Sequence, residues 1–295
     1  MRRIGIIGVG LLGSAVASRL LQRGFEVTGF DTCPEPLRAL GTQGLRAAAS
    51  IAEVAAGADA VFTILPSLES VETVVCGPGG LVESAAPHTI VMQMSTISPA
   101  LTQRLHQALI GTCGFLDTPM SGTSAMVARG DCAILVGGEA AYVQQCQPIF
   151  DAIARRTVHI GAVGMASLAK LATNLLVALN TAALAEALVL AAKGGLDLAR
   201  LLDALADSAA DSRMMEVRGP LMVAGEFPPQ MKLDLFLKDL RLMLEEGQRL
   251  SVPLPLTSTA QQLYAATAAG GAGSQDLAVV MTRLAHMAGL TRPAA

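Results

Sequence analysis

The 295-residue sequence contains no tryptophan, and aromatic residues make up only 3% of it although 52% of its residues are hydrophobic. Its core must therefore consist mainly of alanine, leucine, valine and methionine, which suits closely packed helices and strands. Charged residues amount to 15%, the formal net charge is −3, and no block of lysine or arginine occurs. These values provide no electrostatic attraction for a polynucleotide, so we expect no nucleic-acid partner.

Cysteine and histidine are sparse and scattered. The five cysteines form no Cys-x-x-Cys pair, which is typical of reduced thiols in a cytosolic protein, so we predict a cytoplasmic location. The four histidines lack i, i+4 spacing and a nearby acidic partner in the sequence. We therefore predict no metal site.

Two apolar segments imitate targeting or membrane sequences. Residues 1–21 begin with two arginines ahead of an apolar stretch, as a secretory signal does, but their glycines fit a different pattern described below. The run 166–192 is long enough to span a bilayer, yet it contains Lys170, Asn174, Asn180 and Glu186, which are costly in lipid. We interpret it as a buried helix between domains and expect no membrane partner.

Short β-rich runs alternate with helical patterns in the first half of the chain. These runs cover residues 4–7, 27–30, 60–64, 89–92, 115–116, 133–136 and 158–160. Such alternation predicts crossover connections and a mainly parallel sheet, and the strand signals stop after Gly164. We therefore predict an α/β fold: an N-terminal, doubly wound Rossmann domain at residues 1–163, followed by an all-helical C-terminal domain at 164–295 for substrate binding and oligomerisation.

The second half carries recognisable helix boundaries. The long helix is expected to end at Gly194 and Gly195, and Asp197 is placed to cap the next helix. Ser274 is expected to cap the last helix. Two further helices are expected between these two capped ones, and Pro253 and Pro255 separate them from each other.

A glycine-rich turn follows the first predicted strand and opens a helix, with the sequence Gly8-Val9-Gly10-Leu11-Leu12-Gly13. The first glycine permits a tight turn, the second lets the backbone approach a pyrophosphate, and the third lets the helix pack on the strand. The N–H groups at the start of that helix then face the phosphates. A purely structural turn is the alternative, but the complete fingerprint favours a dinucleotide site.

Asp31 stands at the end of the second predicted strand, where a carboxylate accepts hydrogen bonds from the adenosine ribose. It would repel a 2′-phosphate, so we predict NAD rather than NADP, although Arg38 could fold back toward such a phosphate. Leu65-Pro66-Ser67 and Ser95-Thr96-Ile97 follow later strands, at the edge where open sheets bind ligands. They are candidate walls for the nicotinamide half, and each alone would be an ordinary loop.

Lys170 and Asn174 lie one helical turn apart in the apolar run, so they share one face of the helix. A buried ammonium needs a cleft, a partner or water, which makes Lys170 a functional candidate. The alternative is a lysine whose charged end reaches solvent at a helix end. Earlier in the chain, Ser121-Gly122-Thr123 offers backbone N–H groups and two hydroxyls suited to a carboxylate.

Four stretches together resemble the β-hydroxyacid dehydrogenase family, which includes 3-hydroxyisobutyrate dehydrogenases and tartronate semialdehyde reductases. They are the glycine turn at 8–13, the loop at 117–130, the helix start at 161–174, and Lys238-Asp239-Leu240. The resemblance covers essentially the whole chain and implies a Rossmann domain, a helical domain and an active site in the cleft between them.

The resemblance also implies residue roles. Lys170 would be the catalytic acid/base, with Asn174 orienting the substrate, and Lys238 would reach cofactor and substrate from the second domain. Ser121, Gly122 and Thr123 would hold the substrate carboxylate. Thr123 replaces a glycine common in the family, as does Ala166, and Met231 stands where an aromatic residue often lines the pocket. These departures make the substrate the least transferable inference.

We therefore expect an enzyme that transfers hydride between NAD and a small, singly charged hydroxy acid or semialdehyde, such as a 3-hydroxyisobutyrate-like acid. One alternative is an NADP-dependent imine reductase, against which Lys170 and Asp31 both argue. Another is a non-catalytic dinucleotide-sensing module, which would leave the Ser121 loop without a task. Surplus apolar surface on the C-terminal helices predicts a homodimer or homotetramer.

Overall fold

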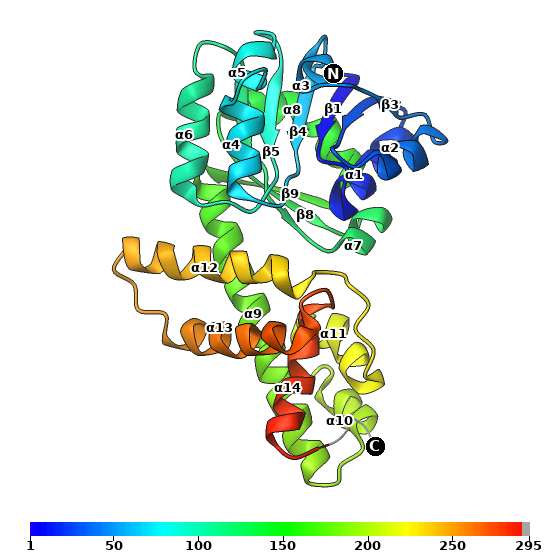
Figure 1. The fold of residues 1–295 in the computed structure, drawn as a ribbon, viewed down its shortest axis with the longest axis vertical. Helices are drawn as coiled ribbons and strands as arrows, with labels where there is room; N and C mark the ends of the chain where they lie inside the picture. The colour runs from blue at the N-terminus through cyan, green and yellow to red at the C-terminus, as the bar shows by residue number, and fades with distance from the viewer. Residues whose placement is uncertain (291–295) are drawn as a thin grey trace. The chain divides into compact units, whose positions relative to one another are not determined.

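A computed structural model describes residues 1–290 (Figure 1). The last five residues of the expected second domain, 291–295, lie outside the described part. The chain divides into two compact units, Met1–Lys170 and Leu171–Ala295. The domain boundary expected between residues 163 and 164 stays a prediction.

Residues 1–290 contain one nine-stranded sheet, which belongs to the first unit. Its strands are β1 (Arg3–Ile7), β2 (Glu26–Phe30), β3 (Arg46–Ala47), β4 (Ala60–Thr63), β5 (Ile90–Gln93), β6 (Gly114–Asp117), β7 (Met120–Ser121), β8 (Ala133–Gly137) and β9 (Arg156–Gly161). The order is β3-β2-β1-β4-β5-β6-β8-β7, with β9 beside β8. The strands from β1 to β6 pair in parallel, in the order of a Rossmann sheet, whereas β8 runs antiparallel to β6 and β7. This confirms the predicted mainly parallel sheet.

Helices cover both faces of this sheet, as a doubly wound fold requires. Those of the first unit are α1 (Leu11–Gln22), α2 (Pro34–Gly41), α3 (Ile51–Ala55), α4 (Leu68–Cys76), α5 (Leu81–Ser84), α6 (Pro99–Leu109), α7 (Ser124–Arg129) and α8 (Ala140–Ile153). One buried cluster joins Ile6 to α1, α2 and α8, and the other joins Ile7 to α3, α4, α5 and α6. Successive side chains of β1 point to opposite faces of the sheet, so Ile6 and Ile7 belong to the cores on the two faces.

Beyond the sheet the described chain is helical. Its elements are α9 (Met165–Lys193), α10 (Leu198–Leu205), α11 (Arg213–Ala224), α12 (Leu233–Arg249), α13 (Pro255–Thr267), the π-helix η1 (Ala268–Ala272), the 3₁₀ helix η2 (Leu277–Val279) and α14 (Val280–Met287). Asp197 caps α10 as predicted, because its side chain accepts a hydrogen bond from the N–H of Arg200 at 2.9 Å. The expectation for Ser274 is wrong: Asp276 caps the last helical segment instead, accepting the N–H of Ala278 at 3.0 Å.

The long helix α9 is apolar enough to cross a membrane by length and composition, with a mean hydropathy of 2.0 in its most apolar window. In the second unit α9 is bonded to α13, because the hydroxyl of Tyr264 donates to the backbone carbonyl of Ala178 at 2.9 Å. Leu176 and Leu190 remain exposed on the same helix. The absence of a membrane partner stays a prediction.

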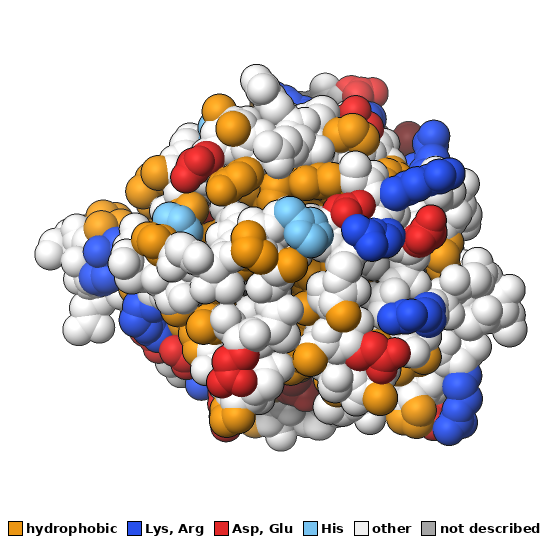
Figure 2. Space-filling view, turned by 90° about the horizontal axis from the view of Figure 1, so that it is seen from above, with side chains coloured by type: hydrophobic (Ala, Val, Ile, Leu, Met, Phe, Trp, Pro, Cys, Tyr) orange, Lys and Arg blue, Asp and Glu red, His pale blue; other side chains and the backbone are white. Residues whose placement is uncertain are grey.

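Surface charges of the first unit are balanced locally. Arg104 pairs with Glu72 at 2.8 Å, and Arg3 pairs with Asp59 at 3.3 Å. On the face seen in Figure 2, basic, acidic and apolar side chains are interspersed, and the basic ones form no continuous band there. This face therefore offers no extended positive surface.

Candidate active site

The glycine turn between β1 and α1 is built by close backbone contacts. Gly8 has a φ of +95°, and its N–H donates to the carbonyl of Phe30 at 2.9 Å. A Cβ added to Gly13 would lie 2.0 Å from the carbonyl oxygen of Gly8, whereas a Cβ on Gly10 would meet nothing within 4 Å. The outer glycines are thus required by the turn itself, and Gly10 faces open space.

The start of α1 suits an anionic ligand. Gly10 is its N-cap residue and provides no side-chain hydrogen bond, and the first turn, within the described chain, contains no acidic residue. Leu11 begins the helix with 58% of its surface exposed, while Leu12 packs against the core. Helix N–H groups in this setting attract phosphate, so these residues fit the pyrophosphate of a dinucleotide.

Asp31 lies beside this turn. One carboxylate oxygen accepts the N–H of Val9 at 2.6 Å, and the other accepts the N–H of Cys33 at 2.8 Å. The residue is only partly buried, so the carboxylate can still accept ribose hydroxyls. Arg38 pairs with Glu35 at 3.9 Å, and both side chains are highly exposed.

The loops after β4 and β5 are joined through Ser95. Its hydroxyl accepts the N–H of Leu65 at 2.8 Å and donates to the carbonyl of Thr63 at 3.3 Å. Thr96 follows directly and is partly exposed. This bonding fixes two of the predicted nicotinamide walls relative to each other.

Two residues of the predicted wall after β4, Pro66 and Ser67, are outside the bonding to Ser95. The side chain of Ser67 caps α4 by accepting the N–H of Ser70 at 3.1 Å, in a capping box. Pro66 is exposed.

The predicted carboxylate loop includes β7, where Ser121 pairs with Ala133 of β8. Gly122 has a φ of +152°, and an added Cβ there would lie 2.8 Å from Cβ of Cys132. The hydroxyl of Thr123 accepts the N–H of Met126 at 3.3 Å and so caps α7. The turn is therefore held by the β7–β8 pairing before Gly122 and by the α7 cap after it. Ser121 and the backbone of Gly122 lie at this turn.

Asp117, the last residue of β6, is fully buried and was not among the predicted site residues. One carboxylate oxygen accepts the N–H groups of Ser167 at 2.7 Å and Gly164 at 3.2 Å, and the other accepts the Ser167 hydroxyl at 2.8 Å. Burial raises the pKa of this carboxyl to about 6, although the hydrogen bonds from Ser167 oppose the rise. A lone acidic residue ending an apolar strand was the signal available in the sequence.

Lys170 follows Ser167 by three residues in α9 and closes the first unit. It is 7% exposed, so its side chain does not extend along the surface into solvent. The first unit therefore contains the glycine turn, Asp31, the Ser121 loop and this lysine.

In the second unit the structure brings together Asn174, Lys238 and Asp239. The Asn174 amide donates to Asp239 at 2.7 Å, and the Lys238 ammonium lies 3.2 Å from the other oxygen of the same carboxylate. Met231 is held separately, because its N–H donates to the buried Asp276 at 2.9 Å. The NH₂ group of Asn174 therefore points toward Asp239, which leaves the carbonyl oxygen of the amide on the other side.

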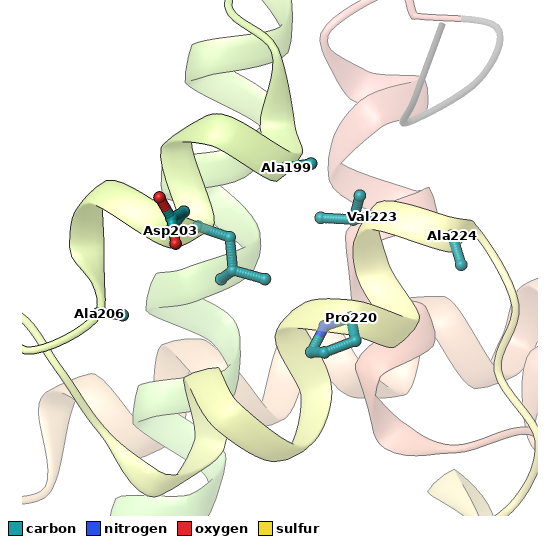
Figure 3. Close-up of a pocket in the computed structure, with 7 residues that line it drawn as sticks. Ala199, Asp203, Ala206, Pro220, Val223 and Ala224 are labelled. Carbon is teal, nitrogen blue, oxygen red and sulfur yellow. The ribbon is translucent and has the colours of Figure 1, made fainter.

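An open groove of about 520 Å³ lies between α10 and α11 in the second unit (Figure 3). It is lined by Ala199, Leu202, Asp203, Ala206, Pro220, Val223 and Ala224. None of the predicted site residues lines it.

Comparisons with known proteins cover nearly the whole chain. Residues 3–161 match the family described as the NAD binding domain of 6-phosphogluconate dehydrogenase. Residues 164–284 match the family described as NAD-binding of NADP-dependent 3-hydroxyisobutyrate dehydrogenase. The two matches meet near the start of α9.

Individual relatives agree with these matches. The 2-(hydroxymethyl)glutarate dehydrogenase of Eubacterium barkeri is 34% identical over 98% of this chain and 97% of its own length. The 2-hydroxy-3-oxopropionate reductase of Escherichia coli strain K12 is 32% identical over 97% and 98%. The crystal structure of a 3-hydroxyisobutyrate dehydrogenase from Salmonella typhimurium superimposes with a TM-score of 0.88 at 32% identity, covering 96% of this chain and all of that one.

Proposed function

Because the chain belongs to the β-hydroxyacid dehydrogenase family of NAD(P)-dependent oxidoreductases, we propose that it interconverts a small hydroxy acid and its aldehyde or ketone with NAD, using Lys170 as general acid/base. The observation that carries this proposal is the burial of Lys170, at 7% exposure, in the same compact unit as the glycine turn and the Ser121 loop. Lysine is rarely buried in a folded protein, so a lysine buried in this unit indicates a specific role.

The residues divide the chemistry in a simple way. When bound, the nicotinamide accepts or returns the hydride. Lys170 takes the hydroxyl proton during oxidation and returns it from its ammonium form during reduction. Ser121, Gly122 and Thr123 hold the substrate carboxylate, with Ser121 and the Gly122 backbone as the main donors because the Thr123 hydroxyl already caps α7. Asn174 orients the substrate, and Lys238 contacts cofactor and substrate.

NAD is the preferred cofactor in this proposal. The Asp31 carboxylate would accept ribose hydroxyls and repel a 2′-phosphate. Arg38, the nearby guanidinium that could favour NADP, pairs with Glu35. Gly8, Gly10, Leu11, Leu12 and Gly13 form the pyrophosphate turn.

A small acid with one carboxylate is the proposed substrate class, and Met231 provides a flexible apolar wall for it. The printed names of the relatives describe different acids, 2-(hydroxymethyl)glutarate and 2-hydroxy-3-oxopropionate among them. Each of these compounds carries a hydroxyl close to a carboxylate. A 3-hydroxyisobutyrate-like acid fits the same description.

Steady-state assays of NAD and NADP reduction with a panel of hydroxy acids test the proposal. Lys170→Ala should lower turnover at least about 100-fold, the usual contribution of a positioned acid/base, and leave NADH affinity within about twofold. Lys193→Ala, an exposed lysine in the last turn of the same helix, is the matched control. Near-normal rates in Lys170→Ala would refute the proposal.

The same panel separates the alternatives. An imine reductase would turn over cyclic imines with NADPH and ignore hydroxy acids. A sensing module would bind NADH with no turnover of any substrate.

A homodimer or homotetramer is also proposed, formed through the second unit. Large apolar side chains stay exposed there, including Leu190 at 77%, Leu256 at 68% and Leu196 at 60%. Large apolar side chains that stay exposed in this number are candidates for burial against another subunit. Sedimentation at micromolar concentration tests this, and a monomer would contradict it.

A further inference from the structure

We propose that Asp117 is a positioning residue for the reaction: its buried carboxylate joins the strand that leads into the Ser121 loop to the helix turn that carries Lys170. This inference rests on the proposed function of Lys170. It assigns a task to a charged group that the catalytic proposal leaves unused.

The carboxylate holds the start of α9 from outside the helix. It accepts the N–H groups of Gly164 and Ser167 and the Ser167 hydroxyl at 2.7 to 3.2 Å. A negative charge at a helix N-terminus is favoured by the helix dipole and by the unpaired N–H groups there. Lys170 lies three residues beyond Ser167, so this anchored turn also fixes the origin of the lysine side chain.

The backbone of Asp117 is fixed equally well on the loop side. Asp117 pairs with Gly137 of β8, and the next residue, Thr118, donates its N–H to the carbonyl of Gln93 at 2.8 Å. Four residues after Asp117, Ser121 pairs with Ala133 of the same β8 strand. One side chain therefore connects the two segments that the proposed reaction must hold in register.

The surroundings leave little freedom for this connection. A Cβ added to Gly137 would lie 2.7 Å from the carbonyl oxygen of Ala162 and 3.4 Å from the Asp117 carboxylate. The Ser167 hydroxyl, which donates to Asp117, also lies 2.8 Å from the hydroxyl of Thr102 on α6. The carboxylate is thus enclosed by β8 and the start of α9, and the Ser167 hydroxyl that donates to it is in turn held by α6.

Asp117→Asn tests the idea with little change in volume. An amide has only one acceptor oxygen, and its NH₂ group would face N–H donors, so the first turn of α9 should loosen. Amide hydrogen exchange at residues 164–167 should accelerate at least about tenfold, while exchange at the glycine turn stays unchanged. Turnover should fall about 10- to 100-fold, because small displacements of a catalytic group cost that much, with NADH affinity within about twofold.

A double-mutant comparison separates positioning from general destabilisation. If Asp117 acts through Lys170, Asp117→Asn should reduce the residual rate of Lys170→Ala by no more than about twofold. The same loss in both backgrounds, or a folded Asp117→Asn protein with normal turnover, would overturn the inference. Near-normal turnover in Lys170→Ala alone would instead overturn the proposed function, and the assigned role of Asp117 with it.

Two further variants complete the test. If Asp117→Asn does not fold, Ser167→Ala removes one of the hydrogen bonds and should lower turnover about 3- to 10-fold with the same dependence on Lys170; unchanged turnover would count against the inference. Asp197→Asn removes a carboxylate cap from α10 in the other unit and should leave turnover within about twofold.

Discussion

Asp31 accepts the backbone N–H of Val9 at 2.6 Å, so the end of β2 is bonded directly to the glycine turn after β1. The carboxylate that is proposed to select the cofactor therefore also braces the loop that is proposed to hold it. Substitution at this position should affect both tasks.

Asp31→Asn should weaken NAD binding about 10- to 100-fold, since hydrogen bonds to charged groups contribute about 1.5–3 kcal/mol. NADP binding should weaken less or improve, because the repulsion of its 2′-phosphate is removed. The ratio of kcat/KM values for the two cofactors measures this. Glu26→Gln removes the same charge from the exposed start of β2, at the other end of that strand, and should leave the ratio unchanged; equal ratios for both variants would contradict the assignment.

Two glycine substitutions should separate folding from binding. Gly13→Ala places a Cβ 2.0 Å from the carbonyl oxygen of Gly8, so it should destabilise the protein by about 1–3 kcal/mol. Gly10→Ala meets nothing within 4 Å and should melt normally, yet it should weaken NADH binding because its methyl group occupies the approach to the pyrophosphate. Thermal melting and NADH titration of both variants measure the difference. Tight NADH binding by Gly10→Ala would argue against a pyrophosphate there.

Asn174→Ala should lower both stability and turnover. It removes the donor that bonds buried Asp239 at 2.7 Å, and a buried acceptor left without its partner costs about 1–3 kcal/mol. Asn180→Ala, at an exposed position on the same helix, should change the free energy of unfolding by less than about 0.5 kcal/mol. Urea unfolding and kcat measurements distinguish the two variants, and equal stability losses would contradict the packing described.

Cysteine labelling should follow burial. Burial raises the pKa of the Cys132 thiol to about 11 and that of Cys146 to about 12, so neither should react with iodoacetamide at pH 8 in the folded protein. Cys33 is exposed and should react first. NADH should protect Cys33 because its N–H bonds Asp31, whereas exposed Cys76 should show no protection. Peptide mapping by mass spectrometry reports each site, and rapid labelling of Cys146 would contradict the burial.

The stability of the protein should depend on Asp117 between pH 4 and 6. Its folded pKa of about 6 lies above the ordinary value of 3.8, so the protonated carboxyl is favoured by folding. This contribution is fully present below pH 4 and is lost as the pH rises through 6, amounting to about 3 kcal/mol. Urea unfolding of the wild type and Asp117→Asn across this range measures the difference. Identical pH profiles would contradict the shift.

The order of strands and helices was predictable because it depends on hydrophobic periodicity and turn residues within short segments. Alternating strand and helix signals indicated seven strands, all of which are present, and the glycine turn stands where the fingerprint requires it. The two missed strands, β3 and β7, contain two residues each and carry no periodicity to detect. Ser274 and Asp276 are both residue types that cap helices well, and only the three-dimensional path of the chain selects Asp276.

The side-chain partners were harder to predict because they lie far apart in the sequence. Asp117 meets Ser167 fifty residues later, and Asn174 meets Asp239 sixty-five residues later. The buried pair of Arg218 and Asp276, 3.0 Å apart, had no sequence signal at all. Such pairs depend on how elements pack, which hydrophobic periodicity does not specify.

Tyr142 in α8 and Tyr264 in α13 are the only tyrosines of a chain without tryptophan, and they fall in different units. Tyr264 is fully buried, packs edge-on against Phe236, and burial raises its pKa above the ordinary value. Ultraviolet fluorescence of the unlabelled protein thus comes from one ring in each unit. Replacing either ring by phenylalanine leaves a single native optical probe, with which the melting of one unit can be followed independently of the other.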